Sequence, residues 1–575
     1  MADTMSLVKY ARNRLPVLRS STEVVVAEPP VEVLPKKPAR FVEVKVEELT
    51  RDRNSTMSGP SGLAERILRR QLSDQQSKEE MTNKHGKYNP RMLVIIPAWN
   101  EAHCIRDGLE GLADQELPEG VDMDILVMAD NCEDNTAQVA EKAGKELGLN
   151  LEVRPTVNNE QHKVGAHNQA WAQAFVDEVV NWETIPATQA EEDYRDSVQA
   201  IIAMDADSRF GPGALIKLWK VFASAPNKIG AVSPIFIPRI PKSKRKLDSD
   251  DPHYKEKIES GQYGGAITRW WAAMQNHEFT AWQILTILAR GDTTYVNGGQ
   301  GSLFNAKVLR EMVDGNERID SPWDTESEVE DMHLTWRIQE MEKETIVCPG
   351  TRCYVDPMRS YHTLQKQRAK WDGGQMGLLR EKANKTIHKG LLWRQQARIS
   401  LDFSVRVIFY ALLAVALSTG QFVWEWIWIT PLALASVLNT MLALKSPQHR
   451  TIDVIYAATV VTPEVYTSVR ISVWARAWVK QFSVQRSSAW AAQYDAQEGK
   501  TKSKLGPGLM LCAMLAAGAV YAAIHFSYYL TSHAVQYATR PYVHAGYVVL
   551  TVLTILTILI MVRQIFVVWR TPYRV

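Results

Sequence analysis

Four long runs without a charged residue constrain the fold of this 575-residue chain more than any other feature. Each run is close to or longer than the roughly 20 residues with which an α-helix crosses ~30 Å of hydrocarbon. Buried helices of soluble proteins can also be apolar on all sides, but four such runs in the last third of a chain favour membrane spans. We therefore predict spans at about 405–424, 426–444, 508–530 and 542–562.

The charges around these runs predict the orientation of the chain. Residues 403–575 hold 14 lysines and arginines against 5 acidic residues. Because loops rich in Lys and Arg stay on the cytosolic side, we expect a multi-pass protein of the cell (inner) membrane whose large N-terminal part is cytosolic. Residues 452–495 are apolar but interrupted by charges and rich in tryptophan, which favours interfacial helices; a fifth crossing is the alternative.

The composition of the whole chain excludes several classes of protein. Hydrophobic residues make up 46% and charged residues 23%, unlike a disordered, collagen-like or disulfide-framework protein. The five cysteines fit a reducing compartment, and residues 1–19 lack the continuous apolar segment of a signal peptide. Residues 1–88 are rich in proline, serine and charge, so we expect a flexible tail there.

A regular alternation of apolar runs and helical segments begins near residue 91. The apolar runs lie at 92–96, 125–129, 151–153 and 200–204, and the helical patterns at 102–113, 136–147 and 164–180. Continuous apolar strands separated by helices indicate βαβ units and a mostly parallel sheet covered on both faces. We therefore predict an α/β, Rossmann-like domain over 89–400 and an α-helical transmembrane domain over 401–575.

Polar residues follow three of these apolar runs. The first run leads into Pro97, Asn100 and Glu101, and the second into Asp130. Asp and Asn also cap helices, so capping is the structural alternative for Asp130. Because ligands of such sheets collect at the carboxyl ends of the strands, we expect these side chains to share one crevice.

The third run ends in Asp205-x-Asp207, one of three D-x-D patterns in the chain. The pair Asp122/Asp124 precedes its strand, and Asp248/Asp250 lies in a charged, solvated segment. Only Asp205 and Asp207 end a buried strand, where residues two apart point to the same side. Their hard oxygen ligands suit Mg²⁺ or Mn²⁺ bridging the phosphates of a nucleotide.

Two later segments supply further reactive groups. Glu330 and Asp331 open a predicted helix, where acids stabilise the helix dipole but one can also act as a base. A segment ahead of the membrane runs then offers cations for phosphate and an indole for a sugar face, although anionic lipid is the alternative ligand. Its relevant residues are Gln367, Arg368, Lys370 and Trp371.

In this order and spacing, the five motifs from Pro97 to Trp371, followed by apolar helices, resemble the membrane-bound family 2 glycosyltransferases, which include cellulose, chitin and hyaluronan synthases. The resemblance implies a GT-A fold and inverting transfer from a nucleotide sugar. It places Asp130 at the uracil, with Pro97, Asn100, Glu101 and Lys163 in the same nucleoside pocket. It places Asp205 and Asp207 at the diphosphate, with both aspartates as ligands of Mg²⁺ or Mn²⁺.

The resemblance also assigns the acceptor side of the reaction. Asp331 would be the general base, with Glu330 beside it. A loop that includes Gly301 and Ser302 would contact the acceptor. Donor phosphate and acceptor sugar would be clamped by Gln367, Arg368, Lys370 and Trp371, with Lys370 where the family usually has arginine.

Three functions remain open on these residues. The first is a polysaccharide synthase that extends a glycan from a UDP-sugar at the cytosolic membrane face. The second is a transferase that adds one sugar to a lipid-linked acceptor, and the third is a non-catalytic membrane scaffold or transporter. The expected partners are the nucleotide sugar, a glycan or lipid-linked acceptor and the bilayer; self-association stays open, and we expect no nucleic acid.

Overall fold

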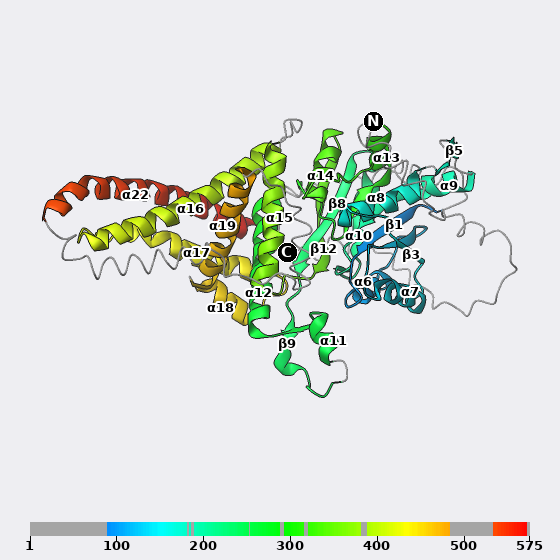
Figure 1. Ribbon diagram of the computed structural model, residues 1–575, viewed down its shortest axis with the longest axis horizontal. Coiled ribbons are helices and arrows are strands. Elements are labelled where there is room, and N and C mark those ends of the chain that lie inside the picture. Colours follow the sequence, from blue (N-terminus) through cyan, green and yellow to red (C-terminus); the bar gives the residue numbers. More distant parts are fainter. Residues whose placement is uncertain are drawn as a thin grey trace. The chain divides into compact units, whose positions relative to one another are not determined.

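The computed structural model describes residues 89–176, 178–180, 183–185, 189–251, 254–287, 293–315, 320–380, 388–459, 461–482 and 533–571. The chain forms two compact units. Within the described residues, the first unit runs to Gly265 and resumes over Ile287–Asp356, and the second comprises Ala266–Thr286 and the chain from Pro357 on. Figure 1 shows both units and labels many of their helices and strands.

The first unit is built on an eight-stranded mixed sheet (Figure 1). The strand order is β3-β2-β1-β6-β11-β8-β12-β7. In chain order these strands are β1 (Arg91–Ala98), β2 (Asp122–Ala129), β3 (Leu151–Pro155), β6 (Val198–Ala203), β7 (Arg209–Phe210), β8 (Ile229–Pro238), β11 (Ser302–Asn305) and β12 (Glu344–Val355).

The first four strands of that order are parallel, as the apolar runs predict. Strand β11 instead runs antiparallel to both β6 and β8, and β7 runs antiparallel to β12. Sequence patterns did not reveal this half of the sheet, because strand direction depends on pairing partners far apart in the chain. The antiparallel β11 brings the loop before Ser302 to the end of β6.

Helices cover the sheet. One buried cluster joins Leu93 and Ile95 of β1 to α8 (His162–Phe175), α13 (Ala306–Asp314) and α14 (Glu330–Glu340). The alternate residues Met92 and Val94 are equally buried, as expected for a sheet covered on both faces. The other helices of this unit are α6 (Ile105–Ala113), α7 (Thr136–Leu147), α9 (Gln189–Ser197), α10 (Ala214–Ser224) and α11 (Tyr254–Glu259).

Several predicted boundaries shift in the structure. The helix expected to reach residue 180 ends at Phe175, and β4 (Glu178–Val180) pairs with β5 (Glu183–Ile185) beyond it. Strand β2 begins at Asp122, so Asp122 and Asp124 lie within the strand that they were expected to precede. Both aspartates bind Arg91, at 3.2 and 2.6 Å, which explains why acidic residues are tolerated in a strand. A further small sheet pairs β9 (Lys242–Ser243) with β10 (Tyr263–Gly264).

The second unit is helical. Its helices are α12 (Ala266–Trp282), α15 (Tyr361–Arg380), α16 (His388–Ser418), α17 (Thr430–Lys445), α18 (Thr451–Ala458), α19 (Val461–Phe482) and α22 (His533–Arg570). A π-helical turn, Gln283–Ile287, extends α12. We predicted a boundary at residue 400, but α12 and α15 are part of this unit, because their side chains pack on its helices.

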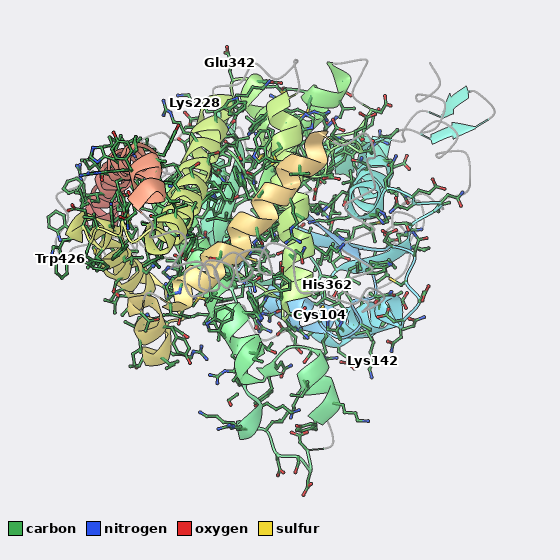
Figure 2. The ribbon with its side chains drawn as sticks, turned by 60° about the vertical axis from the view of Figure 1, so that its left-hand side comes forward. Cys104, Lys142, Lys228, Glu342, His362 and Trp426 are labelled. Atoms are coloured by element: carbon green, nitrogen blue, oxygen red, sulfur yellow. The ribbon has the colours of Figure 1, made fainter. Side chains whose placement is uncertain are left out.

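Three helices of the described residues are long and apolar enough to cross a membrane: Lys389–Leu417, Trp426–Lys445 and Val535–Arg570. They correspond to three of the four predicted spans, and the fourth, 508–530, lies outside the described residues. The first helix begins earlier than predicted and ends before residue 424. Trp426, labelled in Figure 2, is 75% exposed, as suits a tryptophan at a membrane interface.

The predicted interfacial segment 452–495 contains α18 and α19, and residues 483–495 lie outside the described part of the chain. Helix α19 packs along α15, where Val473 and Trp474 are buried. The Trp474 and Trp478 indoles both donate to Gln396 Oε1 of α16. Part of the tryptophan signal in this segment therefore reflects packing between helices.

Candidate active site

The centre of the site is the ammonium group of Lys163, on the first turn of α8. Its Nζ lies 2.5 Å from Asp205 Oδ1 and 3.8 Å from Glu330 Oε1. Burial opposes protonation of Lys163, but the charges on Asp205 and Glu330 outweigh that effect and raise its pKa. Lys163 therefore stays protonated. Its positive charge lies between Asp205, at the end of the strand with the D-x-D pair, and Glu330, at the start of α14.

Asp331, the second residue of α14, lies at the same place and contacts the neighbouring glycine loop. Its Oδ2 accepts a hydrogen bond of 3.2 Å from the Gly299 amide, while Oδ1 accepts from the Met332 amide. A Cβ on Gly299 would lie 3.1 Å from Lys163 Nζ, so this glycine also borders the lysine. The site therefore gathers Lys163, Asp205, Glu330, Asp331 and the glycine loop.

A short bridge fixes this loop to the helix that carries Asp331. The Thr335 hydroxyl donates to the Asp331 carbonyl at 2.7 Å, and it accepts from the Asn297 amide at 2.8 Å. Both Asn297 and Thr335 are fully buried. This contact couples the position of the carboxylate to the loop, because neither end can move without breaking a buried hydrogen bond.

The acidic side of the site is crowded. The pKa of Asp207 is raised well above its usual range, mainly by burial. The negative charges of Asp205, Asp356 and Glu101 add to this shift. Burial also raises the pKa of Glu101 to about 7, with Asp205 adding to the shift. Carboxylates held this close are oxygen donors that a divalent cation stabilises, so Asp205 and Asp207 fit Mg²⁺ or Mn²⁺.

Asp130 lies directly after β2 and is buried, with 3% of its surface exposed. Its Oδ1 accepts hydrogen bonds from Asn159 at 2.7 Å, Thr156 at 2.8 Å and Asn131 at 3.0 Å. It caps no helix, since α7 begins six residues later. The contacts instead tie the ends of β2 and β3 to the start of α8, which carries Lys163.

The other predicted nucleoside residues lie next to this strand end. Pro97 is a buried residue of β1, paired with Met128. Asn100 has a positive φ of 55°, and its Oδ1 accepts from the Glu133 amide at 2.9 Å, so it shapes the loop after β2. The Glu101 amide donates to Thr136 at 2.8 Å.

The glycine loop departs from one prediction. Gly301 has a φ of 142°, and a Cβ there would lie 2.9 Å from Phe210, so only glycine fits. Ser302, expected to contact the acceptor, is fully buried in β11, and its hydroxyl bonds Ser233 and the Gly298 carbonyl at 2.7 Å. Ser302 therefore supports the loop from beneath and does not face a substrate.

Trp323 is a site residue that sequence reasoning missed. It is 2% exposed, and its backbone exchanges hydrogen bonds of 2.8 and 3.3 Å with the Asn168 side chain of α8. Its ring stacks on His167 at 4.8 Å. Trp323 thus fastens the loop before Glu330 to the helix of Lys163; a tryptophan within a polar loop was the available signal.

A second set of metal-type ligands lies at the start of α6. Glu101, His103 and Cys104 place one ligand atom each within 4.8 Å of one another. Figure 2 labels Cys104 in the first unit. The Cys104 thiol donates to Glu101 Oε2 at 2.9 Å. This group contains neither of the predicted metal ligands, Asp205 and Asp207.

In the second unit, α15 carries the residues of the predicted clamp. Arg368, expected to hold phosphate, is 1% exposed and binds Glu278 of α12 at 2.8 Å. That guanidinium is fully engaged inside the helical unit, so the phosphate-binding prediction is not supported for Arg368. Lys370 is also buried, whereas Gln367 and Trp371 are half-buried.

The mixed sheet, the paired aspartates that follow β6 and the carboxylates at the start of α14 match the GT-A glycosyltransferase arrangement that the motifs predicted. Residues 90–374 match the model of the family described as "Glycosyltransferase like family 2". These residues therefore form a family 2 glycosyltransferase domain. The resemblance, the fold class and the enzyme class predicted from the motifs are thereby confirmed.

Two curated relatives are similar over half of the chain. Both are poly-beta-1,6-N-acetyl-D-glucosamine synthases of Staphylococcus epidermidis, 24% identical over 288 residues, or 50% of this chain. The match covers 55% of the relatives, so the chain spans about half the length of the curated relatives it matches.

Solved structures with overlapping folds include a mannosyltransferase and S. aureus TarS. The mannosyltransferase PcManGT of Pyrobaculum calidifontis, in complex with GDP-Man and Mn²⁺, has a TM-score of 0.36 and 15% identity, covering 81% of this chain and 99% of its own. Residues 1–349 of S. aureus TarS, in complex with UDP-GlcNAc, have a TM-score of 0.31 and 13% identity, covering 69% and 93%. Overlaps at these scores establish no correspondence between residues.

Proposed function

We propose that this protein transfers a sugar, with inversion, from a UDP-sugar to a growing glycan at the cytosolic face of the cell (inner) membrane, as a polysaccharide synthase. The observation that carries the proposal is the position of Lys163 between Asp205 and Glu330. The Lys163 ammonium group lies between Asp205, which is proposed to act at the donor diphosphate, and the start of α14, which carries the proposed base Asp331. The names of the curated relatives support a polysaccharide product.

Asp331 is the general base in this proposal. A sugar hydroxyl is a weak nucleophile, so a carboxylate must take its proton as it attacks the anomeric carbon. The Gly299 amide and the Thr335 bridge orient that carboxylate. One base on one side of the sugar, without a covalent intermediate, gives inversion.

The leaving group is stabilised from the opposite side. Lys163 offsets negative charge that grows on the departing nucleoside diphosphate, and this charge is largest in the transition state. Asp205 and Asp207 would hold Mg²⁺ or Mn²⁺, which supplies further positive charge to the same oxygens. Asp130 and the residues around Asn100 form the wall for the nucleoside.

The test is a donor screen with purified protein in lipid nanodiscs. Radiolabelled UDP-glucose, UDP-N-acetylglucosamine and UDP-glucuronate are supplied with Mg²⁺ or Mn²⁺, and the product is sized. Long polymer supports the proposal, and one sugar on extracted lipid supports a single-sugar transferase on a lipid-linked acceptor instead. If the wild type forms no more product than D331N with any of the donors, both transferase functions are overturned.

A further inference from the structure

A carboxylate outside every predicted motif organises the second unit. Glu278 lies on α12, and its two oxygens accept four hydrogen bonds from three side chains. Arg368 of α15 donates two of them, at 2.8 and 3.2 Å. Tyr466 and Arg470 of α19 donate the others, at 2.6 and 2.8 Å. Glu278 of α12 is thus the shared acceptor of two other helices, α15 and α19.

The charges of this cluster balance. Arg470 also binds Asp372 of α15 at 3.3 Å, so two guanidinium groups face two carboxylates. Arg368 and Asp372 are buried. Removing one partner from such a cluster leaves a buried charge without compensation, and the remaining side chains must then rearrange. The arrangement of α15 therefore depends on Glu278.

Arg368 also contacts two residues of the predicted clamp, Trp371 and Gln367, so their positions depend on Glu278 as well. Its guanidinium lies over the Trp371 ring, 4.3 Å from the centroid, and 5.8 Å from that of Phe279. It also donates a hydrogen bond to Gln367 Oε1. Because a planar guanidinium stacks on a ring in a defined direction, the direction set by Glu278 also sets that of Trp371.

We propose that Glu278 is a positioning residue for the acceptor sugar: it orients Trp371 and Gln367 through the guanidinium of Arg368. The inference rests on the proposed function, together with the assignment of Trp371 to the acceptor that the family resemblance implies. Glu278 touches no substrate itself. Arg368 thereby connects α12 to the Gln367 and Trp371 side chains of α15.

The test compares E278Q and E278D with E464Q. Glu464 is a matched control, because it binds Arg406 through two bonds of 2.6 and 2.7 Å within the same unit and is similarly exposed. Acceptor KM is measured with the oligosaccharide that the wild type elongates fastest, UDP affinity by calorimetry, and melting temperature in nanodiscs. We expect E278Q to raise the acceptor KM at least tenfold. E278D should give an acceptor KM between those of E278Q and the wild type, and UDP affinity should be the same in all variants.

Each result separates a positioning role from a merely structural one. E464Q should lower the melting temperature as E278Q does but leave the acceptor KM unchanged. Equal acceptor KM values in E278Q and E464Q would overturn the inference. If E278Q does not fold, the acceptor KM of E278D tests the inference instead. An E278D acceptor KM equal to that of the wild type would then overturn the inference. A wild type without transferase activity would instead refute the proposed function.

Discussion

Lys163 Nζ lies 2.5 Å from Asp205 Oδ1, although Lys163 is at the start of α8 and Asp205 follows β6, 42 residues later in the chain. The same ammonium group lies 3.8 Å from Glu330, which follows 125 residues after Asp205 in the chain. This one cation therefore relates the strand end suited to the diphosphate to the helix start suited to the base. Three substitutions test what this arrangement does, and one pH series tests the ion pairs of Glu278 in the second unit.

Asp331→Asn should abolish transfer while donor binding is retained. The amide keeps the size of the side chain but cannot accept a proton, so we expect kcat to fall by about 10³-fold or more, within the usual contribution of a general base and its orientation. Radiolabelled product and UDP calorimetry measure the two effects. Asp314→Asn, at an exposed acid of α13, is the control. An active Asp331→Asn enzyme would refute the base assignment.

Asp207→Ala should weaken donor binding that depends on metal. We expect the Mn²⁺ concentration for half-maximal UDP binding to rise about tenfold or more, because a cation held by hard oxygen ligands loses one of them. The control is Asp250→Ala, in the exposed D-x-D pair of the first unit. A titration that is the same for Asp207→Ala and wild type would count against the metal assignment.

Gly299→Ala should displace Lys163 at little cost to the fold. The new Cβ would lie 3.1 Å from Nζ, whereas a Cβ at Gly265 meets no atom within 4 Å. We expect kcat/KM to fall about tenfold, equivalent to ~1.4 kcal/mol of transition-state stabilisation, with a melting temperature near that of the wild type. Gly265→Ala should be unaffected in both measurements. Full activity of Gly299→Ala would show that the position of Lys163 is not limiting.

Glu278 in the second unit should make the stability of the protein depend on pH. Burial opposes ionisation of Glu278, but Arg368 and Arg470 outweigh it and lower the pKa to about 2. The unfolded value is about 4.3, so ionised Glu278 stabilises the fold above that pH, by ~3 kcal/mol, and this contribution is lost as the pH falls toward 2.

The corresponding measurement is the difference in melting temperature between wild type and E278Q. It should be largest near pH 7 and shrink steadily below about pH 4, because protonated Glu278 resembles glutamine. E464Q provides the comparison for acid effects elsewhere in the unit. A difference that stays constant from pH 7 to pH 3 would contradict the low pKa of Glu278.

The sequence determined the parts of the site that lie at the ends of local patterns. Apolar runs predicted β1, β2, β3 and β6, and therefore which polar residues follow them, because a buried strand requires consecutive apolar side chains. The helix at Glu330 was likewise legible from its acidic first turn. Composition alone revealed the apolar helices, since hydrocarbon excludes charge.

Only the tertiary structure decided which of these residues meet. The antiparallel pairing of β11 with β6 brings the Gly299 loop, which contacts Asp331, to the end of β6, and no local pattern encodes that pairing. Arg368 reads as a phosphate ligand in the sequence but is neutralised by Glu278, 90 residues earlier. The physical reason is the same in both cases: local side-chain chemistry sets secondary structure, whereas ion pairs and strand neighbours depend on contacts that the folded chain alone provides.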